Sequence, residues 1–256
     1  MTERSNAGVA HALRDGFARI AAAPVVAVGL FVVLRLLELS EDDGWTMIAA
    51  GKRRTIVALL FWAFAYGGVI DRYARNRPTR AHGFFAACGG HFLPLVRLAI
   101  VPLLVAWSLI VLQPGVVAGS AVVLAVNIVM LFARIRLVVE DRRSAIGAIL
   151  AGIRFVRRNV VSVAILWVIY AVLHVALGKA ANWLTVPAGH PWIARVIDEA
   201  FFALSLWQAT LFPYATGVAL FQSRLAHAGY TAAPPAVWPE SASAEAIANA
   251  APTITP

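Results

Sequence analysis

Six long apolar runs divide this sequence, and they constrain its fold more than any other feature. The hydrocarbon core of a bilayer is about 30 Å thick, so a helix needs roughly 20 mostly apolar residues to cross it. The runs that meet or approach this length cover residues 20–39, 55–70, 92–112, 116–138, 160–177 and 199–222. They predict an all-α fold, an integral membrane bundle of six transmembrane helices.

The composition agrees with a membrane protein. Hydrophobic residues make up 61% of the 256 residues and charged residues 14%, whereas soluble domains are about half apolar and about a quarter charged. We expect residues 1–222 to form one transmembrane domain. The Ala- and Pro-rich segment 223–256 is expected to be a disordered cytoplasmic tail. The single cysteine, Cys88, excludes an intramolecular disulfide.

The basic residues predict the orientation in the membrane. Almost all of the 22 Lys and Arg residues border apolar runs, which argues against nucleic acid as a partner. Fifteen of them lie on the side that carries both chain ends, and five lie on the opposite side. Because cytoplasmic loops are enriched in Lys and Arg, this asymmetry predicts a multi-pass protein with both termini in the cytoplasm.

Three amphipathic segments precede the odd-numbered spans. Their apolar faces carry Val9, Leu13, Phe17 and Ile20; Phe84, Phe85, Cys88 and Phe92; and Ile146, Ile149, Leu150, Ile153 and Val156. We expect three amphipathic interfacial helices, with the apolar face in lipid or against the bundle and arginines near anionic headgroups. Helix starts are expected at Ser5 or Asn6, at Thr79 and at Ser144.

The order of these elements suggests a threefold repeat. Each unit would contain an interfacial helix, a span outward and a span back, at residues 7–70, 79–139 and 144–222. The alternative is that any segment leading into a span looks amphipathic, because the chain leaves water there.

Six arginines are the first set of candidate site residues. Those expected to contact lipid headgroups or a cytoplasmic protein partner are Arg134, Arg136, Arg142, Arg154, Arg157 and Arg158. The alternative is an ion-pair network that fixes helix depth, since Arg136 and Glu140 lie four residues apart on one helix face.

A second set of candidates lies within the spans. Asn127, His174 and Gln208 are polar residues expected at membrane depth, where they could line an intramembrane polar path. The alternative is that they form hydrogen bonds between helices, which is the commoner role of such residues.

The sequence offers no residues for catalysis, for a cofactor or for a metal. The phosphate-binding loop, the nucleophile elbow and the H-E-x-x-H zinc motif do not occur. His82, Cys88 and His91 lie within ten residues, but on a helix His82 points away from Cys88. We therefore expect neither an enzyme nor a metal site.

Two stretches resemble a known group of proteins. They are GGVIDRYARNRPTRAHGFFAACGGHF, residues 67–92, and ARIRLVVEDRRSAIGAILAGIRFVRRN, residues 133–159. They look like the corresponding parts of uncharacterised bacterial six-span inner-membrane proteins, which are distantly similar to the membrane domain of some bacterial glycerophosphodiester phosphodiesterases. The resemblance covers about residues 10–220 and implies a six-helix fold in the bacterial cytoplasmic (inner) membrane. It implies no catalysis, because the phosphodiesterase site belongs to a separate soluble barrel.

These observations favour a polytopic inner-membrane protein of non-enzymatic type. It would act through contacts with anionic membrane lipids or with a protein partner, as a subunit or a membrane-organising factor. The main alternative is a small transporter or lipid-handling permease. An intramembrane enzyme acting on lipids is a third possibility, for which the sequence identifies no residues.

Overall fold

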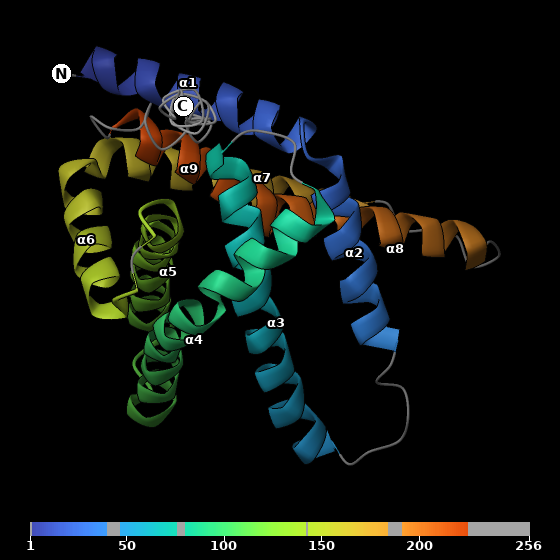
Figure 1. Ribbon diagram of the computed structural model, residues 1–256. Helices are drawn as coiled ribbons and strands as arrows, with labels where there is room; N and C mark the ends of the chain where they lie inside the picture. The colour runs from blue at the N-terminus through green and yellow to red at the C-terminus, as the bar shows by residue number, and fades with distance from the viewer. Residues whose placement is uncertain (1, 40–46, 76–79, 142, 184–190, 225–256) are drawn as a thin grey trace, which may run out of the picture.

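The computed structural model describes residues 2–39, 47–75, 80–141, 143–183 and 191–224. Within them the chain is helical apart from short connections, which confirms the all-α prediction (Figure 1). The elements are α1 (Thr2–Ala21), α2 (Pro24–Leu39), α3 (Met47–Arg75), α4 (Ala81–Leu112), α5 (Val116–Val139), α6 (Ala145–Arg158), α7 (Val160–Trp183), α8 (Pro191–Leu206), the π-helical turn η1 (Trp207–Leu211) and α9 (Phe212–Ser223).

Three helices in the described part of the chain are long and apolar enough to cross a membrane. They are α4, α5 and α7, and their spanning segments cover Ala81–Leu112, Val116–Val139 and Val160–Ala181. A fourth is added if Gly8–Ala21 and Pro24–Arg35 are taken together as one bent span. These helices agree with a multi-pass membrane protein, but by this criterion the structure does not confirm all six predicted spans.

A sharp bend separates α1 from α2. The two helices meet at an angle of 70°, and the break falls just before Pro24. Proline has no backbone N–H and disfavours a helical conformation in the residue before it. The first span was predicted to start at residue 20, but α2 starts at Pro24, so that prediction is corrected by four residues. Helix α1 also starts at Thr2, before the predicted Ser5 or Asn6.

The second predicted interfacial helix is not a separate element. Helix α4 runs without a break from Ala81 to Leu112 and carries Pro94 and Pro102 inside it. The segment around Phe84 is therefore the first part of the long helix, which continues through Gly89, Gly90 and Pro94. Arg80 occupies the N-cap position, and the predicted start at Thr79 lies outside the described residues.

A separate helix is found where the third interfacial helix was predicted, and its start at Ser144 is confirmed. Helix α6 begins after Ser144, whose Oγ accepts a hydrogen bond of 3.2 Å from the backbone N–H of Gly147. It ends at Arg158, and α7 begins two residues later. In the last part of the chain, α8, η1 and α9 follow one another without a gap, so the predicted span 199–222 lies inside a longer helical stretch.

The C-terminal halves of α3 and α5 and the whole of α9 form much of the core. The large side chains that are fully buried there include Ile70 and Tyr73 of α3, Phe132 and Ile135 of α5, and Phe212 and Leu220 of α9. Each of these core helices has one main partner outside the core. Helix α3 packs on α4, α5 packs on α6, and α9 packs on α1, which lies across the end of the bundle (Figure 1).

Small residues bring each of these pairs together. A Cβ atom on Gly68 of α3 would lie 2.5 Å from the Cys88 Sγ of α4. A Cβ on Gly152 of α6 would lie 2.9 Å from the Val129 carbonyl oxygen of α5. On Gly16 of α1, it would lie 2.5 Å from the Thr216 side chain of α9. All three contacts thus require glycine for the close approach of two helices.

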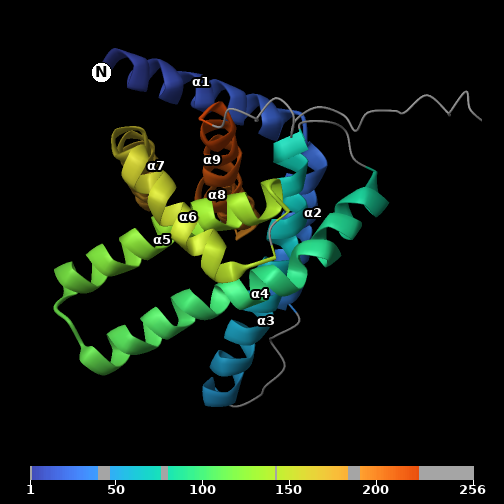
Figure 2. The ribbon, with the colours of Figure 1, turned by 60° about the vertical axis from the view of Figure 1, so that its left-hand side comes forward.

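The opposite end of the bundle is open. Helices α4 and α5 extend side by side away from α9 and are joined by residues 113–115 (Figure 2). Near this connection Leu112 is 75% exposed and Val116 is 86% exposed. Of the predicted tail 223–256, only Ser223 and Arg224 belong to the described residues.

Candidate functional site

Helix α6 presents two different faces. Its buried face is made of the small residues Ala148, Ala151 and Gly152, which meet α5. Its outer face carries Ile146 and Leu150, which are 73% and 58% exposed. The apolar face predicted from the sequence is therefore divided in α6: Ile146, Leu150 and Ile153 point away from the bundle, whereas Ile149 and Val156 pack against the core.

The basic residues of α6 border this outer face. Arg154, Arg157 and Arg158 are all exposed. No carboxylate in the described part of the chain forms an ion pair with any of them. Their guanidinium groups are therefore available to an anionic group outside the chain, such as a phosphate.

The other candidate arginines lie elsewhere. Arg134 Nη1 donates a hydrogen bond of 2.7 Å to the Tyr214 hydroxyl, and the guanidinium lies 4.8 Å from the centre of the Tyr66 ring. Arg136 Nε lies 2.9 Å from Glu140 Oε2, the intrahelical ion pair weighed as the alternative. Arg142 lies outside the described residues. The structure thus separates the five candidate arginines that it describes, and among these only the three on α6 share one exposed surface.

Two of the three predicted intramembrane polar residues meet. His174 Nδ1 lies 3.2 Å from Gln208 Oε1, and Gln208 Nε2 donates a hydrogen bond of 3.2 Å to the Tyr170 carbonyl. Asn127 is exposed on α5 and bonds only to the Val123 carbonyl of its own helix, at 3.0 Å. The structure therefore brings His174 and Gln208 together but places Asn127 apart from them.

A buried arginine joins three helices at the packed end of the bundle. Arg19 of α1 is 7% exposed and forms an ion pair of 2.7 Å with Asp15. Its Nη1 donates to the Tyr73 carbonyl of α3 and, at 2.8 Å, to Gln222 Oε1 of α9. In the sequence, Arg19 is counted only as a charge that flanks a span. The one nearby residue that indicated an ion pair is Asp15, four residues earlier.

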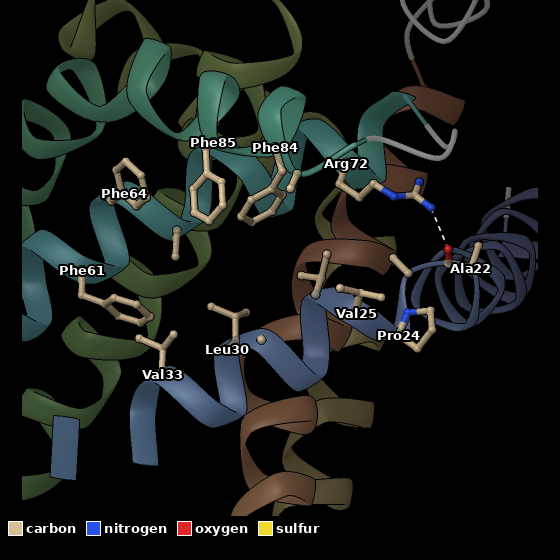
Figure 3. Close-up of a pocket in the computed structure, with 15 residues that line it drawn as sticks. Ala22, Pro24, Val25, Leu30, Val33, Phe61, Phe64, Arg72, Phe84 and Phe85 are labelled. Atoms are coloured by element: carbon tan, nitrogen blue, oxygen red, sulfur yellow. Dashed lines mark hydrogen bonds between the residues drawn. The ribbon is translucent and has the colours of Figure 1, made fainter. Parts of the chain in front are cut away.

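An apolar pocket opens between α2, α3 and α4. It has a volume of about 440 Å³, and its lining includes Leu30 of α2, Phe61 and Arg72 of α3, and Phe84 of α4 (Figure 3). Among the described residues of the lining, Arg72 is the one that carries a charge, and it is 6% exposed. Sequence reasoning missed this site, because the lining residues come from three helices and only the bend before Pro24 brings them together.

The residues weighed for metal binding have separate surroundings. Cys88 is fully buried against α3, while His82 is exposed. His91 Nδ1 lies 3.9 Å from Asp141 Oδ1, at the edge of a second pocket of mixed charge. In the described part of the chain, no group of three or more His, Cys, Asp or Glu residues could hold a metal ion.

Comparisons with known proteins identify no relative. No protein-family model, no curated protein and no solved structure matches the chain. The resemblance to bacterial six-span proteins therefore stays a prediction. Any function must be argued from the geometry described above.

Proposed function

We propose that this chain is a non-enzymatic protein of the bacterial inner membrane that acts through contacts with anionic lipids. It would cross the membrane six times with both termini in the cytoplasm. The observation that carries the proposal is the outer face of α6, where exposed Ile146, Leu150 and Ile153 lie beside exposed arginines. A protein partner could use the same surface, as a subunit would.

The physical argument for lipid starts from the exposed side chains of α6. Burying one large aliphatic side chain contributes about 1.5–3 kcal/mol, yet α6 leaves Ile146, Leu150 and Ile153 exposed, although Phe155 of the same helix packs on the core. At a membrane interface these side chains would enter the acyl region, and the arginines would meet the headgroups. The face therefore has the two chemical properties that an anionic bilayer surface requires.

Helix lengths support the additional spans. Helix α3 has 29 residues, or about 43 Å at 1.5 Å per residue, which exceeds the hydrocarbon thickness. Helix α2 has only 16 residues, or about 24 Å, and would need a locally thinned bilayer. The continuous helical stretch from Pro191 to Ser223 provides the sixth crossing.

The pairing of helices supports the threefold repeat. In each unit the returning helix ends in the core and packs on the first helix of the next unit, as α3 does on α4 and α5 on α6. Helix α9 closes the series by packing on α1. Since a small residue mediates each contact, we propose that the three units share one packing scheme.

The test is lipid selectivity in reconstituted vesicles. We would place the full chain in phosphatidylcholine vesicles and measure, by electron paramagnetic resonance, its association with spin-labelled phosphatidylglycerol relative to spin-labelled phosphatidylcholine. Replacing Arg154, Arg157 and Arg158 by Gln should lower this preference by at least about fivefold, since each basic residue near an anionic surface contributes about 1 kcal/mol, or a factor of about five. Arg195→Gln, an exposed charge on the predicted opposite side, is the control. An unchanged preference in the triple variant would contradict the proposal.

A second candidate function is transport, including lipid handling. The observation that favours it is the His174–Gln208 contact at the π-helical turn η1, since π-helical turns occur frequently at functional sites. Fluorescent phosphatidylglycerol in the same vesicles tests this idea through its rate of transbilayer movement. Gln208→Leu should slow that rate if the path exists, whereas Asn127→Ala should not. Equal rates for the wild type and protein-free vesicles would rule out lipid movement.

A further inference from the structure

The pocket between α2, α3 and α4 has an unbalanced charge. Arg72 is 6% exposed, and its Nη2 donates a hydrogen bond of 2.7 Å to the Ala22 carbonyl. Its Nη1 is buried and has no hydrogen-bond partner. The neighbouring carboxylate, Asp71, is paired with Arg75 at 2.7 Å. No described acidic residue lines the pocket.

An anion bound beside Arg72 would stabilise its buried guanidinium. A guanidinium does not lose its proton in proteins, so burial cannot neutralise Arg72. A buried charge without a counter-charge is strongly unfavourable, and an unpaired buried donor adds a further cost. A carboxylate or phosphate beside Nη1 would remove both costs with one charge-assisted hydrogen bond.

The rest of the pocket lining is apolar and suits a hydrocarbon chain. Apart from Arg72, the described lining residues are aliphatic, aromatic, glycine or proline. The side chains of Phe61, Phe64, Phe84 and Phe85 lie on one side of the pocket and those of Leu30 and Val33 on the other, with Arg72 near one end (Figure 3). A cavity of about 440 Å³ falls within the usual range for small-molecule sites, roughly 300–1,000 Å³.

We propose that this pocket binds one anionic phospholipid of the surrounding bilayer, with an acyl chain between α2 and α4 and the headgroup phosphate at Arg72. The proposal rests on the proposed function and deepens it, because it assigns a specific lipid site in addition to the α6 surface. The bend before Pro24 prepares the site: it leaves the Ala22 carbonyl free to accept from Nη2, which fixes the guanidinium at the end of the pocket.

The rim indicates that the ligand comes from the membrane and not from water. Val25 is 81% exposed, Phe85 is 59% exposed and Val33 is 40% exposed, and all three line the pocket. A water-soluble anion would have to pass this apolar rim, whereas the acyl chain of a neighbouring lipid is already in contact with it.

Native mass spectrometry of the full chain tests the site. We would incorporate the protein into nanodiscs with equal amounts of phosphatidylglycerol and phosphatidylcholine, release it, and measure the fraction that retains one phosphatidylglycerol. We expect the wild type to retain phosphatidylglycerol in preference to phosphatidylcholine. Arg72→Gln should weaken retention about ten- to hundredfold, the effect of losing a hydrogen bond to a charged group. Arg97→Gln, an exposed arginine of α4 that does not line the pocket, should leave retention unchanged.

A second variant keeps the test valid if Arg72→Gln does not fold. Gly29 lines the pocket, and a Cβ atom there meets nothing within 4 Å, so Gly29→Leu fills the cavity without disturbing helix contacts. It should abolish retention, while Gly89→Leu, another open helical glycine, should not. Retention that is unchanged in Gly29→Leu, or equal for the two lipids in the wild type, would overturn the proposal.

The two lipid proposals fail separately. If the pocket binds no lipid but the α6 surface does, the pocket variants retain as much phosphatidylglycerol as the wild type. The triple Gln variant of α6 still loses its lipid preference in that case. If only the pocket binds lipid, the α6 variant keeps its preference while Arg72→Gln and Gly29→Leu lose retention.

Discussion

The two ends of this bundle are held by different forces. At the packed end, which we define as the C-terminal halves of α3 and α5 together with α9 and α1, polar side chains join the helices. Gln222 of α9, for example, donates a hydrogen bond of 2.9 Å to the Ala74 carbonyl of α3. At the open end, the outer parts of α4 and α5, polar groups bond only to their own helix, as Ser108 does to the Leu104 carbonyl at 2.8 Å.

The difference shows what makes helices associate in lipid. Apolar side chains gain little by leaving acyl chains for one another, so close packing and hydrogen bonds between helices must supply the stability. The packed end has both, through its glycine contacts and through Arg19 and Gln222. The open end has neither and keeps Leu112 and Val116 exposed, which is acceptable only where the surroundings are hydrocarbon.

The largest effect should come from removing Arg19. Arg19→Ala leaves Asp15 unpaired and removes a donor from Gln222 and from the Tyr73 carbonyl. Loss of one partner of a buried ion pair costs about 3 kcal/mol, so the free energy of unfolding in mixed detergent–SDS micelles should fall by about that amount. Arg14→Ala, an exposed arginine on the same helix, should change it little. Equal stability of the two variants would show that polar contacts do not hold the packed end.

The next largest change in stability should depend on whether the substituted glycine lies against another helix. Gly152→Ala places a methyl group 2.9 Å from the Val129 carbonyl oxygen, and such overpacking typically costs about 1–3 kcal/mol. Gly89→Ala meets nothing within 4 Å and should stabilise its helix by about 0.5–1 kcal/mol. The same SDS titration measures both changes. If both have the same sign, the close α5–α6 contact is not a feature of the folded protein.

A smaller effect is expected from one hydrogen bond between helices. Tyr170 of α7 shares a hydrogen bond with Thr216 of α9, and both residues are buried. Tyr170→Phe removes this bond but keeps the ring, so stability should fall by about 1 kcal/mol. Thr216→Val in the Tyr170→Phe background should then add less than it does alone. Strict additivity of the two substitutions would mean that the two hydroxyl groups do not interact.

The smallest effect is expected at the open end. Ser108→Ala removes a hydroxyl group that bonds only to the carbonyl four residues earlier in α4. Such a bond joins no two helices, so the free energy of unfolding should change by less than about 0.5 kcal/mol. A loss as large as that of Tyr170→Phe would mean that Ser108 meets another helix, and the open end would then be packed as well.

The sequence predicts the local elements of this fold better than their contacts. Apolar length identifies α5 and α7, and Ser144 identifies the start of α6. Periodicity alone could not show that α4 passes through Gly90 and Pro94 without a break, since the segments before and after them are both helical. It also could not tell which face of α6 meets the bundle, because the small residues Ala148, Ala151 and Gly152 are the buried ones there.

The candidate sites were predicted only in part. Arg154, Arg157 and Arg158 lie on an exposed surface, as a charge near a membrane interface should. Arg19 and Arg72 look the same in the sequence, yet both are buried, because the bend before Pro24 lays α1 across the core and turns α2 towards α3. Burial of a basic residue depends on tertiary contacts, and no local pattern records them.

The pairing of α1 with α9 has a consequence for biosynthesis. Arg19 finds its acceptor on Gln222 only 203 residues further along the chain. The ribosome makes the chain from its N-terminus, so Arg19 can pair with Asp15 of its own helix and then with α3 long before α9, the main packing partner of α1, has been translated. A product truncated before α9 would therefore keep most of its apolar helices but leave α1 without the helix on which it packs.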